Sequence, residues 1–177
     1  DLDEIPNLNQ LNFNEIDNNI VIFEQKMFYY KLNLFYEEYT WQGTKAVKRK
    51  NFISPQWLRN IKGKKYSKWR LDTFFSKKKY SNLLFVKNGG WHFTCLRSPE
   101  ELEKKLLNFA HHYEFEESGL KLDDIKQLIK DKRVMYDHTV DQKGYKWSGK
   151  SILKNLDSKF LPDHVSSNLG KYSDWLD

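Results

Sequence analysis

The sequence predicts one domain of the mixed α/β class, with a mixed sheet and flanking helices. A chain of 177 residues is long enough to bury a core and short for two domains. Hydrophobic residues make up 39% of the chain and aromatic residues 16%, so large apolar side chains are available to fill that core. Segments of strand-like composition alternate along the chain with segments that carry helix signals, which favours a folded α/β domain.

The first third of the chain contains two expected helices and several expected strands. Residues 7–16 have the apolar spacing of a short helix, and residues 20–36 are dense in Val, Ile, Phe and Tyr, which predicts one or two strands. A turn is expected at residues 41–44, followed by a basic strand at 45–51. A serine cap and a first-turn proline then predict a short helix over residues 54–61.

The second half contains two predicted strands and two predicted helices. An apolar run at 83–86 and a strand-like run at 91–95 flank the Asn-Gly-Gly segment at 88–90, whose two glycines predict a bend or a close approach of backbones. The clearest helix covers 98–110, because Ser, Pro and two Glu residues at its start form a capping box. A second helix is expected at 123–132. The buried stripe of the first helix is expected to comprise Leu102, Leu106, Phe109 and Ala110.

Charge and cysteine content narrow the classes of function. Thirty Lys and Arg against 24 Asp and Glu give a net charge of +6, which suits an anionic partner such as a nucleotide phosphate, a nucleic acid or a lipid headgroup. The single cysteine, Cys95, excludes an internal disulfide and a thiolate zinc cluster. No run approaches the roughly 18 apolar residues of a membrane-spanning helix. The sequence opens inside a motif, so we expect that an upstream part belongs to the complete protein.

The opening motif, Asp1-Leu2-Asp3, is suited to binding a hard cation. Side chains alternate along an extended segment, so Asp1 and Asp3 are expected on one face and Glu4 on the other. Mg²⁺ and Mn²⁺ prefer oxygen ligands and often keep positions for water and for the phosphates of a substrate. In a sugar-nucleotide enzyme, such a metal would stabilise the charge that builds on the departing nucleoside diphosphate.

Together with further motifs downstream, the segment that contains this pair of acids spans most of the chain. The quoted segments, in order, are Asp1-Leu2-Asp3-Glu4-Ile5-Pro6 with Asn7-Leu8-Asn9-Gln10-Leu11, Tyr30-Lys31-Leu32-Asn33-Leu34 leading to Trp41, Gly89-Gly90-Trp91-His92-Phe93, Ser98-Pro99-Glu100-Glu101, Asp124-Ile125-Lys126-Gln127-Leu128-Ile129, and Leu153-Lys154-Asn155. In sequence, order and spacing this set resembles the N-acetylglucosaminyltransferases of glycosyltransferase family 17. Gly-Trp-His with a capped helix behind it, about ninety residues after the acids, is the most specific part of the resemblance.

The resemblance implies the C-terminal portion of a glycosyltransferase A-type, Rossmann-like domain spanning residues 1–177, with the nucleotide-binding strands upstream. It implies an inverting transfer of N-acetylglucosamine, or a related sugar, from a UDP-sugar donor to a mannose-containing glycan acceptor. The pair His111-His112 and the Lys/Asn-rich tail depart from the family pattern and leave the acceptor open. A cytoplasmic place in a microbial or viral host and a Golgi membrane in a eukaryote both fit this reading.

Most of the expected site residues belong to the matched motifs, and His111 lies outside them. Asp1, Asp3 and His92 are expected to bind Mn²⁺ or Mg²⁺ and the diphosphate, and His92 is alternatively a strand histidine bound to a backbone carbonyl. Contacts with donor or acceptor are expected from four residues: Gly90, Trp91, Trp41 and His111. Trp91 alternates to the face opposite His92, which favours a place in the core over a role as a platform for a sugar. His111 and His112 are expected at the end of the capped helix, where a role in capping competes with a role as ligands.

An inverting transfer requires a carboxylate that takes the proton from the attacking acceptor hydroxyl. Four residues are candidates for this base: Glu4, Glu114, Asp123 and Asp137. Glu4 belongs to the matched motif, whereas Glu114 lies just past the histidine pair and is placed slightly ahead.

The stretch from Lys62 to Lys79 supports an alternative class of function. It contains eight Lys or Arg residues interleaved with aromatic side chains, the composition of a module that binds nucleic acid through phosphate contacts and stacking. No known RNA- or DNA-binding motif accompanies it, so nucleic acid is not the expected partner. A loop on the acceptor side, or a surface for peripheral contact with an anionic membrane, explains the stretch equally well.

Overall fold

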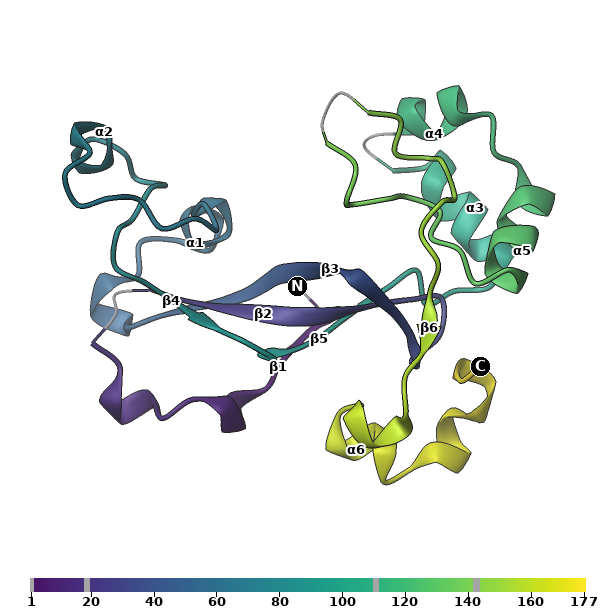
Figure 1. Ribbon diagram of the computed structural model, residues 1–177, viewed down its shortest axis with the longest axis horizontal. Coiled ribbons are helices and arrows are strands. Elements are labelled where there is room, and N and C mark those ends of the chain that lie inside the picture. Colours follow the sequence, from purple (N-terminus) through teal and green to yellow (C-terminus); the bar gives the residue numbers. More distant parts are fainter. Residues whose placement is uncertain (1, 18–19, 110–111, 142–143) are drawn as a thin grey trace. The chain divides into compact units, whose positions relative to one another are not determined.

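The computed structural model describes residues 2–17, 20–109, 112–141 and 144–177, and Figure 1 shows its helices and strands. In this described part, six strands form a mixed sheet: β1 (Glu4–Pro6), β2 (Ile20–Tyr29), β3 (Leu34–Val47), β4 (Leu83–Val86), β5 (Gly90–Thr94) and β6 (Lys154–Asn155). The strands pair in the order β1-β5-β2-β3-β6, and β4 pairs with β2 in parallel. The predicted α/β class with a mixed sheet and flanking helices is confirmed, and the A-type glycosyltransferase fold stays a prediction.

The helices are short. They are α1 (Pro55–Asn60), α2 (Leu71–Phe74), α3 (Pro99–Leu107), α4 (His112–Ser118), α5 (Leu122–Lys130) and α6 (Asp163–Ser166), and 3-10 turns cover Leu8–Gln10, Phe13–Glu15, Arg49–Asn51, Ser158–Phe160 and Leu169–Trp175. Within the described ranges, none of these helices has the length and apolar character needed to cross a bilayer.

The chain divides into two compact units. The first unit comprises Asp1–Gln25 and Trp41–His92, and the second comprises Lys26–Thr40 and Phe93–Asp177. Strands β2, β3 and β5 each contribute residues to both units. The expectation of one partial catalytic domain over residues 1–177 stays a prediction, and the two units are described separately below.

The core of the first unit lies on both faces of β2. Val21 and Phe23 pack with Ile16 and Val86 on one face. Ile20 and Ile22, which alternate with them, pack on the other face in a cluster that includes Ile61 and Leu83. Because residues 20–23 of β2 are covered on both faces and pair in parallel with β4, they form a continuous apolar run without the alternation of a half-exposed strand.

Two glycines bring β5 against β1. Gly89 donates its N–H to the carbonyl of Glu24 at 2.7 Å, and its own carbonyl accepts the N–H of Asn7 at 2.8 Å. Gly90 has a φ of +131°, and a Cβ there would lie 2.0 Å from the carbonyl oxygen of Ile5. The close approach of backbones expected at residues 88–90 is thus confirmed, and it places β5 antiparallel to β1.

In the second unit, α3 packs against α4 and α5. Buried Leu102, Phe115 and Ile125 provide the apolar contacts of these helices. The predicted capping box of α3 is confirmed: the Ser98 hydroxyl accepts the N–H of Glu101 at 3.2 Å, and the Glu101 carboxylate accepts the N–H of Ser98 at 3.3 Å.

The predicted C-terminal end of α3 is wrong. The helix stops at Leu107, because the Asn108 side chain donates to the carbonyl of Lys104 at 2.7 Å and the backbone leaves the helical region there. Phe109 therefore lies beyond the helix and is half exposed, and Ala110 lies outside the described residues. His112 begins α4 instead of ending the capped helix, so the expected interaction with a helix C-terminus is also wrong.

Three other local predictions are wrong. Residues 41–44 form no turn, because β3 continues through them; Gly43 serves close packing, since a Cβ there would lie 1.9 Å from Oε1 of Gln25. The strand expected at 45–51 stops at Val47 and gives way to a 3-10 turn. The helix expected over 7–16 is replaced by two 3-10 turns, each opened by an asparagine whose side chain accepts a backbone N–H.

A buried carboxylate organises the polar part of the second unit. Asp137 accepts the hydroxyl protons of Tyr36 at 2.7 Å and Thr139 at 2.6 Å, and it lies 2.8 Å from the hydroxyl of Ser151. Burial by itself would raise the pKa of Asp137, but the hydrogen bonds from Thr139, Tyr36 and Ser151 outweigh it and lower the pKa to about 2.

The hydrogen bonds of Asp137 should make the free energy of unfolding depend on pH. The folded pKa of Asp137, about 2, lies below the ordinary 3.8, so the ionised form stabilises the fold above about pH 4 and the contribution disappears as the pH falls toward 2. We expect Asp137→Asn to lose about 2 kcal/mol of unfolding free energy at pH 6, as measured by urea denaturation. The difference from wild type should shrink at pH 2.5, and an equal difference at both pH values would contradict this role.

Candidate metal centre and adjoining cavity

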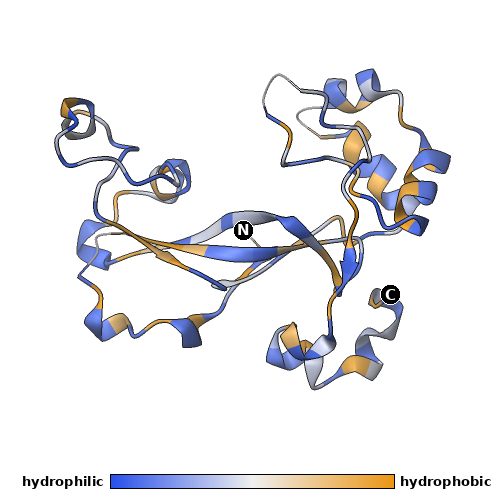
Figure 2. Ribbon diagram, in the orientation of Figure 1, coloured by the Kyte–Doolittle hydropathy of each residue, from blue (hydrophilic) through white to orange (hydrophobic). Residues whose placement is uncertain are grey.

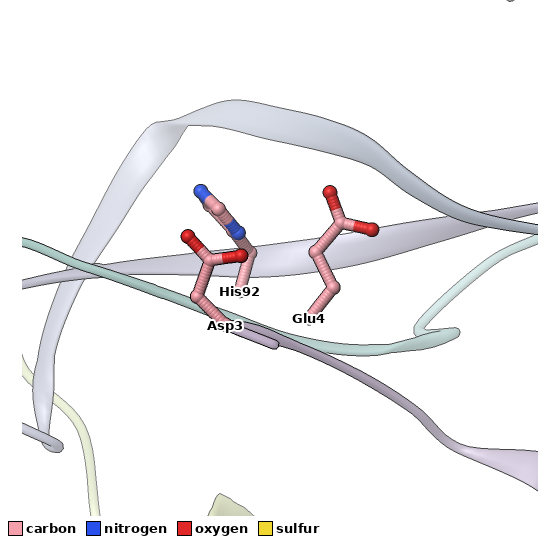
Figure 3. A group of neighbouring side chains, drawn as sticks. All are labelled: Asp3, Glu4 and His92. Atoms are coloured by element: carbon pink, nitrogen blue, oxygen red, sulfur yellow. The ribbon is translucent and has the colours of Figure 1, made fainter. Parts of the chain in front are cut away.

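Three side chains of the first unit converge on one point: Asp3, Glu4 and His92 (Figure 3). Each offers one ligand atom, and these atoms all lie within 4.8 Å of one another. The convergence follows from the strand register, because Glu4 of β1 is paired with His92 of β5 and directly opposed residues share a face of the sheet. The expectation that Glu4 points away from Asp3 is wrong, since Asp3 lies in a turn before β1 and the alternation of a strand does not reach it.

Trp41 of β3 holds two of the three cluster residues. Its indole stacks on the imidazole of His92, with ring centroids 4.5 Å apart and an interplanar angle of 10°. The indole N–H also donates to Oε1 of Glu4 at 2.8 Å, and the hydroxyl of Thr44 lies 3.4 Å from Oε2. Outer contacts of this kind fix the orientation of groups that bind a metal. Trp41 was expected to contact substrate, and the structure places it directly against the cluster.

His92 is buried and carries an unsatisfied nitrogen. Its Nδ1 is enclosed and has no hydrogen-bond partner among the described residues. Burial lowers the pKa of His92 below its ordinary value, although the negative charges of Asp3 and Glu4 and a hydrogen bond to the backbone of Asp3 oppose the shift. That hydrogen bond is of the kind expected for a strand histidine, and it leaves Nδ1 without a partner among the described residues. The imidazole is therefore neutral near pH 7, which is the form that binds metals.

These residues fit a divalent cation. An octahedral ion with ligands at about 2.1 Å separates opposite ligands by about 4.2 Å, so the observed spread of up to 4.8 Å needs only small side-chain movements. Two carboxylates and a neutral imidazole, one nitrogen of which lacks a partner, form a chemically suitable set of ligands. Asp1, the other predicted ligand, lies outside the described residues.

A cavity of about 610 Å³ adjoins the cluster and shares Glu4 with it. Its lining includes two aromatic residues, two hydrogen-bonding side chains and two cations, namely Trp41, Phe52, Thr44, Gln56, Lys45 and Arg59. Lys45 donates to the carbonyls of Arg59 and Ile61 at 2.7 and 2.8 Å, which ties β3 to the end of α1. The volume and the mixture of apolar and polar walls suit a small organic ligand.

The other predicted site residues are not part of the cluster of Asp3, Glu4 and His92. Gly90 is buried where β5 meets β1, and Trp91 is half-buried opposite Ile5. Glu114 belongs to α4 in the second unit, where it lines a separate cavity of about 300 Å³ with Tyr145 and Trp147 among its neighbours. Asp123 is exposed in the first turn of α5, and Asp137 is committed to its buried hydrogen bonds. His111 lies outside the described residues.

Thr44 and Lys45 were missed by sequence reasoning. The segment that contains them reads as a turn followed by a basic strand, so neither was expected beside the acids. One available signal was Gly43, because a glycine inside a β-rich segment indicates close backbone approach as well as a turn.

Comparisons of the chain with protein-family models, with curated proteins and with solved structures found no match. The resemblance to glycosyltransferase family 17 therefore stays a prediction that rests on the quoted motifs.

Proposed function

We propose that this chain carries the metal-binding and substrate-binding groups of an inverting glycosyltransferase, which transfers N-acetylglucosamine or a related sugar from a UDP-sugar to a mannose-containing glycan. The observation that carries the proposal is the convergence of Asp3, Glu4 and His92 beside a cavity that shares Glu4. A sugar-nucleotide enzyme needs both features together, because charge on the leaving diphosphate and the attacking hydroxyl must be handled at neighbouring positions.

Asp3 and His92, with Asp1, are the proposed ligands of Mn²⁺ or Mg²⁺. The bound ion would neutralise negative charge on the diphosphate of the donor as it departs. A histidine ligand favours Mn²⁺ over Mg²⁺, because Mg²⁺ is bound almost entirely by oxygen. Trp41 fixes the imidazole plane of His92 by stacking on it.

Glu4 is the proposed base, since it is the carboxylate that belongs to both the cluster and the cavity. Its carboxylate would accept the proton of the acceptor hydroxyl while that oxygen forms a bond to the anomeric carbon and the bond from this carbon to UDP breaks. The indole N–H of Trp41 holds Oε1 at 2.8 Å and orients the carboxylate for this transfer.

The cavity is the proposed acceptor site. Trp41 and Phe52 supply apolar surface for the carbon face of a sugar ring, and Thr44 and Gln56 supply hydrogen-bonding groups for its hydroxyls.

A donor panel tests the proposal. The intact protein is incubated with each common sugar nucleotide and a mannose-terminated oligosaccharide, and released nucleoside diphosphate is measured with Mn²⁺, with Mg²⁺ and with excess EDTA. We expect one UDP-sugar, UDP-N-acetylglucosamine first, to exceed the others, and EDTA to abolish release because charge on the leaving group is then uncompensated. Full activity in excess EDTA would refute the metal role.

A further inference from the structure

The loop at residues 62–79, called the basic loop below, accounts for the whole net positive charge of the chain. It holds eight Lys or Arg residues and one acid, Asp72, so its net charge is 8 − 1 = +7. The complete chain has a net charge of +6, which leaves −1 for all other residues together. Attraction to an anionic partner is therefore a property of this loop and not of the surface in general.

Large apolar side chains project from the same loop. Trp69 is 92% exposed, Leu71 is 76% exposed and Phe75 is 89% exposed. These residues lie in and beside α2, where hydrophobic and hydrophilic residues are interleaved (Figure 2). Single exposed apolar residues are ordinary, but three within seven positions of a cationic loop mark an interaction site.

The loop is held in shape by the first unit. The backbone N–H of Lys62 donates to the carbonyl of Lys78 at 2.8 Å, and the indole N–H of Trp57 in α1 donates to the carbonyl of Lys77 at 2.9 Å. These bonds join both ends of the loop to each other and to α1. The two ends of the loop are therefore fixed, and its exposed apolar side chains lie between them.

The only acid of the loop is neutralised inside it. Arg70 donates two hydrogen bonds to the carboxylate of Asp72, at 2.8 and 2.9 Å, and Lys79 donates a third at 2.6 Å. Arg70 and Lys79 also lie 5.5 and 5.7 Å from the centre of the Tyr66 ring. The remaining lysines thus present positive charge with no opposing acid in the loop.

We propose that the basic loop binds the surface of an anionic membrane, with Trp69, Leu71 and Phe75 entering the interface and the lysines contacting lipid headgroups. Exposed aliphatic and aromatic side chains beside cations are the composition of interfacial anchors. Long lysine side chains keep their charge at headgroup level while apolar neighbours enter the acyl boundary.

Two features favour lipid over nucleic acid. Leu71 has no ring to stack on a base, whereas a membrane interface accepts it as readily as it accepts Trp69. The cations are seven Lys and one Arg, and that Arg is already bound to Asp72, although Arg is the residue suited to bidentate phosphate and base contacts.

Vesicle co-sedimentation of the full chain tests this inference. Large vesicles of phosphatidylcholine with 30% phosphatidylserine are compared with pure phosphatidylcholine at 150 mM salt. Each lysine near such a surface contributes about fivefold to partitioning, so we expect Lys64→Gln with Lys68→Gln and Lys78→Gln to reduce binding to the anionic vesicles about 100-fold. A matched control, Lys104→Gln with Lys105→Gln and Lys130→Gln, removes the same charge from exposed positions elsewhere and should change binding less than threefold.

The apolar contribution is tested separately. Trp69→Ser with Phe75→Ser should reduce binding to the anionic vesicles by about tenfold or more. The matched control, Ile53→Ser with Tyr113→Ser, removes two other exposed apolar side chains and should bind as wild type. Thermal unfolding midpoints equal to wild type establish that each variant is folded.

Fluorescence quenching measures how deeply the basic loop enters the membrane. Lipids brominated along the acyl chain should quench part of the tryptophan fluorescence, and Trp69→Phe should abolish that quenching while retaining binding. Equal binding to neutral vesicles, equal losses in the matched controls, or tighter binding to a 20-nucleotide oligonucleotide than to anionic vesicles at the same salt would each overturn the inference.

Discussion

Replacing Asp3 with Asn is expected to lower sugar transfer about 10²- to 10³-fold at a Mn²⁺ concentration that saturates the wild type. Asn keeps the shape of the side chain but removes the negative charge that a hard cation requires. Asp3 shares the cluster with Glu4 and His92, whose ligand atoms lie within 4.8 Å of one another. The loss should appear in kcat and in the Mn²⁺ concentration for half activity, measured by release of UDP.

A matched variant isolates the effect of position. Asp163→Asn removes an equivalent charge from an exposed residue at the start of α6 and should leave transfer unchanged. Raising Mn²⁺ should restore part of the activity of Asp3→Asn, because the other proposed ligands, Asp1 and His92, remain. If Asp3→Asn transfers sugar at the wild-type rate over the whole Mn²⁺ range, Asp3 does not bind a catalytic metal.

Replacing Glu4 with Gln is expected to lower kcat about 10²- to 10⁴-fold, the contribution of a positioned base. The amide oxygen of Gln can still accept the indole N–H of Trp41, so the local geometry is kept while the ability to take a proton is lost. The apparent affinity for Mn²⁺ should change little, because Asp3 and His92 are the proposed ligands. Rates at saturating donor and acceptor, together with Mn²⁺ titrations, measure both quantities.

Glu114→Gln is the informative companion to this variant. Glu114 was the first choice as base from the sequence, and it belongs to α4 in the second unit. We expect Glu114→Gln to retain near wild-type kcat. A large loss in Glu114→Gln with normal activity in Glu4→Gln would reverse the assignment, and a large loss of Mn²⁺ affinity in Glu4→Gln would make Glu4 a metal ligand in place of a base.

Signals confined to a few neighbouring residues were read correctly from the sequence. The capping box of α3 at Ser98 and Glu101 depends on residues three positions apart, and the cap of α1 at Ser54 is equally local. Strand β2 was predicted because residues 20–36 are dense in Val, Ile, Phe and Tyr, and its first four residues are buried on both faces. The two caps depend on local sequence alone, whereas β2 is also covered by distant residues such as Ile61 and Leu83.

The site itself depends on pairings that local patterns do not contain. Glu4 and His92 share a face because β1 and β5 pair in one particular register, and a shift of one residue would separate them. Strand alternation predicted the wrong side for Glu4, since the strand begins at Glu4 and Asp3 belongs to the preceding turn. Gly43 suggested a turn, whereas tertiary packing against Gln25 kept the chain extended and placed Trp41 beside the cluster.

Binding of Mn²⁺ to the intact protein, followed by isothermal titration calorimetry near pH 7, tests the central claim most directly. The account predicts one site in the wild type and in Asp163→Asn, and at least about 100-fold weaker binding when Asp3→Asn and His92→Gln are combined. Unchanged stoichiometry and affinity in the combined variant would contradict a metal centre at Asp3 and His92.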